Sequence, residues 1–187
     1  RRAAQAAGDT ADADALVRMG EFYLGVSPQE GRLLYLLARG RHAPRIVEFG
    51  ASYGISTLYL AAAARDAGGH VITTEVHPDK CRAVRQTLAQ AGLAAQVTVL
   101  EGDARDTLPG IAGPVHLVLL DGWKSLYLPV LECLVPKLAP GALIVADNVD
   151  HAAAQDYLAH VSAPAHGYVT ACLGDLALSA WVGPAGA

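Results

Sequence analysis

Apolar runs of six to eight residues recur along the chain, and stretches of helical character alternate with them. The runs are mostly apolar on both faces of a strand, which is typical of a parallel sheet covered by helices on each side. They are RIVEFG (45–50), HVITTE (70–75), VTVLEGD (97–103), VHLVLLDG (115–122) and ALIVADNV (142–149). Helices are expected near 54–67, 79–91, 125–138 and 151–161. This repetition predicts a doubly wound α/β fold.

The two ends of the chain add a helix and a hairpin to this pattern. SPQEGRLLYLLARG opens with Ser27, Pro28 and Glu30, which predict a capping box at the start of a helix. GYVTACLGDLALSAWVG reads as two strands joined around Gly174-Asp175. We therefore predict a Rossmann-like, mostly parallel sheet of seven strands with an antiparallel hairpin at its C-terminal end. It forms one domain over residues 1–187, with an N-terminal helical region at 1–40 and a cofactor-binding core at 41–187.

Composition and charge narrow the classes of function. The 187 residues are 52% hydrophobic and 17% charged, as in a compact globular protein. The net charge of -4 disfavours a nucleic-acid partner, which would select a basic face, and favours a small-molecule substrate. No apolar run reaches the ~18 residues of a membrane span. Three scattered cysteines without a CxxC pair, and a start without an apolar leader, predict a reducing, cytoplasmic location.

Acidic residues and glycines mark the carboxyl ends of the predicted strands, where open α/β sheets bind their ligands. EFGASYGIS places Gly50 and Gly54 four residues apart, so it lacks the GxGxxG spacing of a dinucleotide fingerprint. Glu75 ends the second strand, about where an acid reaches ribose hydroxyls, and Asp103 ends the third. Each feature alone indicates a plain turn or a solvated cap. Their conjunction at successive strand ends predicts an adenosine-binding pocket.

Three oxygen-bearing side chains follow the fourth and fifth predicted strands. Asp121 ends the fourth, and Asp147 and Asn148 end the fifth. If these strands are neighbours, the carboxylates converge and repel each other unless a proton or cation lies between them. Such an oxygen-only set suits Mg²⁺, although Asp147 and Asn148 would also serve as simple turn residues. Lys124 would by itself be a solvated lysine. Beside a dication and a buried cofactor it becomes a candidate base, because such surroundings favour the neutral amine.

A family resemblance joins these segments. VEFGASYGIS, VITTEVHPDK, GDARDTLP, LDGWKSLYLP and ADNV resemble the class I S-adenosylmethionine methyltransferases. More narrowly, they are similar to the metal-dependent O-methyltransferases typified by the catechol and caffeoyl-CoA enzymes, with DGWK and ADNV as the most specific part. The resemblance implies methyl transfer from S-adenosylmethionine to a small catechol-like or phenolic substrate, with Mg²⁺ or another divalent cation. It also implies a possible homodimer.

The resemblance assigns roles to individual positions. Residues implied to bind the cofactor are Val26, Glu48, Gly50, Ser52, Ser56, Glu75, Val76, Asp103, Ala104, Asp121 and Trp123. The implied metal ligands are Asp121, Asp147 and Asn148, and Lys124 is the implied catalytic base. Three departures from the catechol enzyme leave the substrate open: Ala177 replaces a glutamate, Phe22 replaces a tryptophan gate, and Glu30 lies where the family often has a basic residue.

Other classes of function remain as alternatives. One is a methyltransferase-like module that binds the cofactor without transferring methyl groups. The intact set of Asp121, Lys124, Asp147 and Asn148 argues against it. A nicotinamide dehydrogenase is disfavoured by the missing third glycine and the C-terminal hairpin, and a nucleic-acid methyltransferase by the acidic charge.

Overall fold

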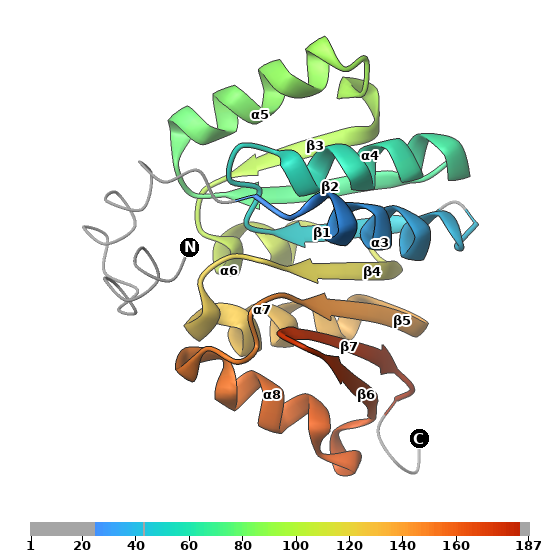
Figure 1. Cartoon of the computed structure of the whole chain (residues 1–187), viewed down its shortest axis with the longest axis vertical. Helices are drawn as coiled ribbons and strands as arrows, with labels where there is room; N and C mark the ends of the chain where they lie inside the picture. Colours follow the sequence, from blue (N-terminus) through green and yellow to red (C-terminus); the bar gives the residue numbers. More distant parts are fainter. Residues whose placement is uncertain (1–24, 43, 184–187) are drawn as a thin grey trace.

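The computed structural model describes residues 25–42 and 44–183, and within them seven strands form one sheet. Their order is β3-β2-β1-β4-β5-β7-β6, parallel except that β7 runs antiparallel to both β5 and β6 (Figure 1). This confirms the predicted sheet and makes the fourth and fifth strands neighbours. The strands are β1 (Arg45–Phe49), β2 (His70–Glu75), β3 (Val97–Glu101), β4 (Val115–Leu120), β5 (Leu138–Ala146), β6 (Tyr168–Leu173) and β7 (Leu176–Trp181).

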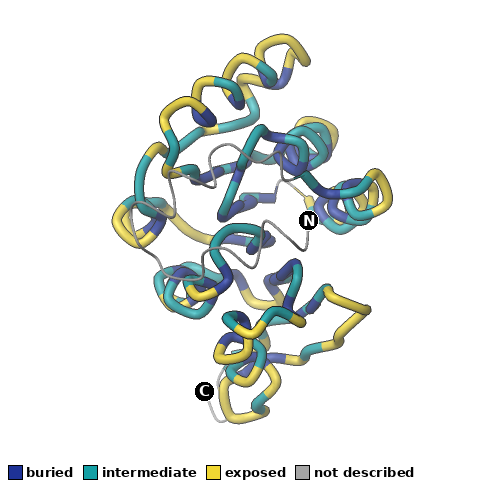
Figure 2. The backbone as a smooth tube through the Cα atoms, turned by 60° about the vertical axis from the view of Figure 1, so that its left-hand side comes forward, coloured by how far each residue is buried: buried dark blue, intermediate teal, exposed yellow. Residues whose placement is uncertain are grey.

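Helices cover both faces of the sheet, as the doubly apolar strands require. Ile46 of β1 packs toward α3 and α4, whereas its neighbour Val47 belongs to the core beneath α7 and α8. The central strands β1 and β4 are accordingly almost entirely buried, whereas exposed residues lie on the edge strand β6, the outer helices and the loops (Figure 2). The helices are α3 (Pro28–Arg39), α4 (Ile55–Ala67), α5 (Pro78–Gln90), α6 (Ala104–Thr107), α7 (Tyr127–Leu134) and α8 (Gln155–Ser162).

The predicted capping box at the start of α3 is confirmed. The amide of Glu30 donates to Ser27 Oγ at 3.2 Å, and the amide of Ser27 donates to Glu30 Oε2 at 2.5 Å. Pro28 occupies the first turn, where its missing N–H costs no hydrogen bond. This cap fixes where the chain turns from the pocket rim into α3.

The C-terminal hairpin also follows the prediction. Leu173 and Leu176 pair across the turn, in which Gly174 has a φ of 69°. Within the described residues no helix is both long and apolar enough to cross a membrane. Phe22 and residues 1–24 of the predicted N-terminal helical region lie outside the described residues.

Candidate active site

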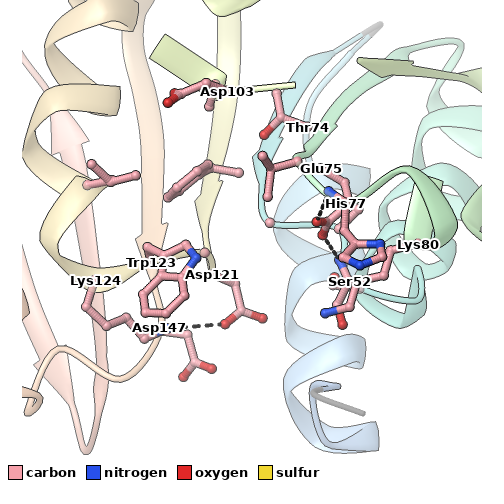
Figure 3. Close-up of a pocket in the computed structure, with 18 of the residues that line it drawn as sticks. Ser52, Thr74, Glu75, His77, Lys80, Asp103, Asp121, Trp123, Lys124 and Asp147 are labelled. Atoms are coloured by element: carbon pink, nitrogen blue, oxygen red, sulfur yellow. Dashed lines mark hydrogen bonds and ion pairs between the residues drawn. The ribbon is translucent and has the colours of Figure 1, made fainter. Parts of the chain in front are cut away.

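A cavity of about 160 Å³ opens at the carboxyl ends of the parallel strands, where the sequence places it. It joins side chains from β1 and β2 to side chains that follow β3, β4 and β5 (Figure 3). All but two of the predicted site residues line it: Gly50, Ser52, Ser56, Glu75, Val76, Asp103, Ala104, Asp121, Trp123, Lys124, Asp147 and Asn148. The topology therefore brings one predicted cofactor end and one predicted chemical end into a single cleft.

Close backbone packing joins the two ends. Gly50 has a φ of 97°, and a Cβ on it would lie 2.6 Å from the Cα of Gly122. A Cβ on Gly122 would in turn lie 2.6 Å from the ring of Phe49. The amide of Asp121 donates to the carbonyl of Phe49 at 2.9 Å. Glycine is required at both turns because no side chain fits between them.

Glu48 lies beneath the pocket rather than on its surface. Its side chain is 0% exposed and accepts hydrogen bonds from Ser56 Oγ (2.5 Å), Thr57 Oγ1 (2.6 Å) and Thr73 Oγ1 (2.5 Å). Burial raises the pKa of Glu48, and the three hydroxyl donors oppose that rise. Ser56 lines the cavity, so its hydroxyl links the cavity wall to the buried carboxylate of Glu48.

Glu75 is held at the rim by two backbone amides. Ser52 N donates to Oε2 and His77 N donates to Oε1, both at 2.9 Å (Figure 3). Ser52 has a φ of 49°, in the left-handed region that few non-glycine residues occupy. Its Oγ is buried and has no hydrogen-bond partner in the described part of the chain. A carboxylate fixed in this way suits the sugar of a nucleoside, whose hydroxyls donate hydrogen bonds.

The rest of the predicted cofactor end of the cavity combines polar and apolar surface. Asp103 caps α6 through the amide of Arg105, and the Arg105 side chain lowers the pKa of Asp103. Val76 lines the cavity and is 39% exposed, while Trp123 also packs against the main core. Trp123 therefore serves as pocket wall and core contact together. Apolar faces flanking a carboxylate suit a flat, polar-edged ring such as adenine.

The chemical end places two carboxylates near one ammonium. Lys124, 7% exposed, lies with its Nζ 3.5 Å from Asp121 Oδ1. Asp147 is 3% exposed. Burial raises the pKa of Asp147 to about 7, and the nearby carboxylate of Asp121 adds to the rise, while Lys124 opposes it. The charges of Glu30 and Asp175 act in the same direction as that of Asp121.

Lys124 also belongs to a buried hydrogen-bond chain. Its Nζ donates to Tyr127 Oη at 2.7 Å, and Tyr127 Oη donates to the carbonyl of Asp147 at 2.9 Å. Burial raises the pKa of Tyr127 well above its ordinary value, and the charges of Asp121 and Asp147 add to the effect. The phenol therefore keeps its proton at neutral pH.

Asn148 completes the predicted ligand set in an unusual backbone conformation. Its φ is 56°, and its Nδ2 donates to Asp147 Oδ1 at 3.2 Å and to Asp175 Oδ2 at 3.5 Å. Among the described residues, no group of three or more His, Cys, Asp or Glu side chains is arranged to hold a metal. A cation here would depend on two carboxylates and an amide, a hard oxygen set that fits Mg²⁺.

Val26 does not line the main cavity. It is buried and faces a small hollow lined also by Glu30 and Asp147, whereas its neighbour Gly25 lines the main cavity. At this point the lining of the main cavity is displaced by one position from the predicted residue. The cause is local: the segment turns into α3 at Ser27, so adjacent residues face opposite sides.

Sequence reasoning left several lining residues unassigned. His77 caps α5 by accepting from Asp79 N, and His151 caps the turn at Ala152–Ala154. Lys80, 7% exposed, lies 5.4 Å from the centroid of the Tyr53 ring. Pro78 after His77 was a usable signal for the first cap, but no sequence pattern marked Lys80. The unassigned lining residues are Gly25, Phe49, Ala51, Thr74, His77, Lys80, Gly102, Gly122, Leu126 and His151.

Residues 47–149, which include the turn at Gly50 and both Asp121 and Asp147, match a family model described as methyltransferase domain. The chain therefore belongs to this family of methyltransferase domains, and the resemblance found in the sequence is confirmed.

Particular relatives narrow the likeness. Catechol O-methyltransferase of Mycobacterium tuberculosis (strain ATCC 25618 / H37Rv) is 40% identical over 129 residues, 67% of this chain and 57% of the relative. That of Niastella koreensis is 35% identical over 140 residues, 73% of this chain and 63% of the relative. The chain thus spans less than two thirds of the length of these two relatives.

Solved structures agree with the fold. The cofactor-bound protein Rv0187 from MTB is 32% identical, with a TM-score of 0.78 over 96% of this chain and 89% of that one. The O-methyltransferase TomG from Streptomyces achromogenes, in complex with SAM, is 28% identical, with a TM-score of 0.75 over 86% of this chain and 82% of that one.

Proposed function

We propose that this chain is an S-adenosylmethionine-dependent O-methyltransferase that uses a divalent cation and acts on a small catechol-like or phenolic substrate. The observation that carries the proposal is the junction of two unlike ends in one cavity. At one end Glu75 is fixed by backbone amides. At the other end Asp121 and Asp147 raise the local negative charge beside Lys124. The catechol O-methyltransferases among the relatives support the same chemistry.

The cofactor end suits the proposed donor of the methyl group. Glu75 would accept hydrogen bonds from the ribose hydroxyls, and Val76 would lie against the adenine with Asp103 and Ala104 at its edge. Gly50, Ser52 and Ser56 would surround the methionine side, with Glu48 behind Ser56. Bound S-adenosylmethionine supplies an electrophilic methyl group on a sulfonium. The chain's part is to orient that group toward the acceptor end, which is the main contribution that positioning makes to such transfers.

The acceptor end would prepare the hydroxyl that receives the methyl group. Asp121, Asp147 and Asn148 would hold the divalent cation. When bound there, the cation supplies Lewis-acid stabilisation of a substrate oxygen. Lys124 lines the cavity and, as the neutral amine, would accept the proton of the substrate hydroxyl. Trp123 would wall the entrance and exclude water.

The proposal extends to the chemical class of the substrate and to the oligomeric state of the chain. Ala177, buried in β7, has no polar side-chain atom, so it cannot bind a second substrate hydroxyl as the glutamate of the catechol enzyme does. Asp175 lies at the hairpin turn, and its carbonyl accepts from the amide of Val149 at 2.8 Å, so it borders the acceptor end. We propose a small-molecule substrate, a cytoplasmic location and a possible homodimer through the apolar hairpin.

The test is transfer of labelled methyl from S-adenosylmethionine to a panel of catechols and phenols, with Mg²⁺ and then with EDTA. Turnover that EDTA abolishes is the expected result. Turnover that EDTA leaves unchanged would contradict the roles of Asp121, Asp147 and Asn148. Calorimetric binding of S-adenosylmethionine without turnover on any acceptor would favour the alternative of a cofactor-binding module.

A further inference from the structure

Tyr127 lies behind the cavity, where it touches the proposed base without reaching a ligand. It is 0% exposed and is not part of the cavity lining, whereas Lys124, three residues earlier, lines the cavity. The Lys124 Nζ donates to its hydroxyl at 2.7 Å. The Tyr127 hydroxyl therefore acts on a reaction in the cavity through its two hydrogen-bond partners, Lys124 and Asp147.

The orientation of the Tyr127 hydroxyl is set from the other side. Its single hydrogen is donated to the backbone carbonyl of Asp147 at 2.9 Å. A hydroxyl that has given its hydrogen away can only accept from its remaining partner. The lone pairs of Tyr127 Oη therefore face Lys124, and one N–H of Lys124 is committed to this bond.

The ring of Tyr127 has little freedom to move. Phe49 and Tyr157 meet it edge-on, with centroid distances of 6.3 Å and 5.6 Å and interplanar angles of 79° and 84°. Phe49 ends β1 and Tyr157 belongs to α8, so elements on two sides hold the ring. The hydroxyl is a fixed point within a close-packed core.

Lysine, by contrast, is a flexible side chain with several rotatable bonds. Two contacts restrain the Lys124 amine: Tyr127 Oη behind it and Asp121 Oδ1, at 3.5 Å, beside it. The carbonyl oxygen that accepts from Tyr127 belongs to Asp147, which directly follows β5. The phenol hydroxyl thus connects the Lys124 amine, in the segment after β4, to the backbone at the end of β5.

We infer that Tyr127 is a positioning residue for the proposed methyl transfer: it holds the Lys124 amine at one point of the cavity wall by accepting its hydrogen bond. The inference rests on the proposed function for Lys124. Tyr127 itself keeps its proton and contacts neither cofactor nor substrate. Because the amine must meet a substrate hydroxyl at hydrogen-bond distance, a small displacement is expected to slow proton removal.

The activity test is a double-mutant cycle between Tyr127→Phe and Lys124→Gln, with Tyr157→Phe as the matched control. Tyr157→Phe also removes one hydroxyl from the same aromatic cluster but leaves the bonds of Lys124 intact. Tyr127→Phe is expected to lower kcat about tenfold, on the scale of one hydrogen bond to a charged group, and to change the KM for S-adenosylmethionine less than twofold. In the Lys124→Gln background the same substitution should change kcat less than twofold.

Two outcomes of the cycle would overturn the inference. One is an equal loss of kcat from Tyr127→Phe in both backgrounds, which would mean that Tyr127 acts on packing alone. The other is a loss of the same size from Tyr157→Phe. Thermal unfolding of each variant separates these effects from a fall in the folded fraction.

A second measurement does not need turnover. Crystal structures of wild type and Tyr127→Phe should show the Lys124 Nζ displaced in the variant, with the main chain at the ends of β4 and β5 unchanged. An unmoved Nζ would refute the positioning role. If the wild type transfers no methyl group on any acceptor, the proposed function fails, but this structural comparison still decides whether Tyr127 places the amine.

Discussion

The two ends of the cavity satisfy their carboxylates in different ways. At the cofactor end Glu48 accepts three hydroxyl hydrogen bonds and Glu75 accepts two from backbone amides, so the folded chain supplies the donors itself. At the acceptor end the carboxylate of Asp147 accepts, among the described residues, only from its neighbour Asn148, through the amide at 2.9 Å and Nδ2 at 3.2 Å. The carboxylate of Asp121 lies 3.5 Å from the ammonium of Lys124, and its charge also acts on Asp147.

This difference separates two kinds of binding. Neutral donors around a carboxylate fix its orientation without adding charge, so the carboxylates of the cofactor end have their donors as soon as the chain folds. Two nearby carboxylates beside one ammonium retain negative charge, which a divalent ion would balance. The comparison therefore predicts that substitutions at the acceptor end affect turnover, and that substitutions at the cofactor end affect affinity and stability.

The largest effect is expected from Asp147→Asn. Removing one charge that acts on the reacting groups should lower methyl transfer by about 10²-fold or more, with a higher Mg²⁺ requirement, because such electrostatic contacts are worth about 10²–10³ in rate. Labelled-methyl transfer across a Mg²⁺ series measures it. Asp175→Asn is the matched control, since Asp175 also borders this end but lies outside the proposed ligand set, and its rate should stay within about threefold of wild type. Equal losses of rate in both variants would contradict a ligand set that includes Asp147 and leaves out Asp175.

The affinity of the cofactor end for S-adenosylmethionine is expected to depend on Glu75. Glu75→Gln keeps the shape of the side chain but replaces one acceptor oxygen by an amide donor, which weakens the hydrogen bonds that Glu75 is proposed to accept from ribose hydroxyls. The Kd for S-adenosylmethionine should therefore rise about 10- to 100-fold, the scale of one charged hydrogen bond. Isothermal titration calorimetry measures it. Glu101→Gln is the control, because Glu101 pairs in register with Glu75 on β3 but lies outside the cavity. A Kd unchanged by Glu75→Gln would place the cofactor elsewhere.

Thr57 tests the buried carboxylate beneath the cofactor end. Thr57→Val removes one of the three hydroxyls that donate to Glu48, and the free energy of unfolding should fall by about 2 kcal/mol, or about 4–8 °C in Tm. Urea denaturation measures it. Thr98→Val, at an exposed position of β3, should change the free energy by less than about 0.5 kcal/mol. A neutral Thr57→Val would show that two hydroxyls suffice for Glu48.

Much of this arrangement could be predicted from the sequence because one rule of the fold connects it. Parallel strands place their carboxyl ends at one edge, so residues that follow successive apolar runs must meet there. Glu75, Asp121 and Asp147 are far apart in the chain, yet each directly ends or follows such a run. Their convergence required only the neighbouring order of β4 and β5, which the structure confirms.

Other features depend on contacts that no local pattern encodes. The donors of Glu48 include Thr73, 25 residues away on β2, and their approach is a matter of register. The left-handed backbone at Ser52 and Asn148 is imposed by the turns around the cavity, because neither residue is a glycine. The four-residue helix α6 is too short for a hydrophobic period. The exchange of Val26 for Gly25 in the cavity lining depends on where one turn begins.

The smallest predicted effect concerns pH and stability at the acceptor end. Asp147 has a pKa of about 7 in the folded chain, above the ordinary value of 3.8, so the folded state binds more protons between about pH 4 and 7. Stability contributed by this group therefore falls as pH rises through that window.

In EDTA, the Tm of wild type relative to Asp147→Asn should fall by at least about 2 °C from pH 5 to pH 8, the equivalent of about 1 kcal/mol. At pH 8, Mg²⁺ should raise the Tm of wild type and leave the Tm of Asp147→Asn unchanged. A cation that balances two carboxylates stabilises only the chain that still has both. A pH-independent difference in Tm between the two proteins would mean that the hydrogen bonds to Asp147 already compensate its charge, and the contrast between the two ends of the cavity would then disappear.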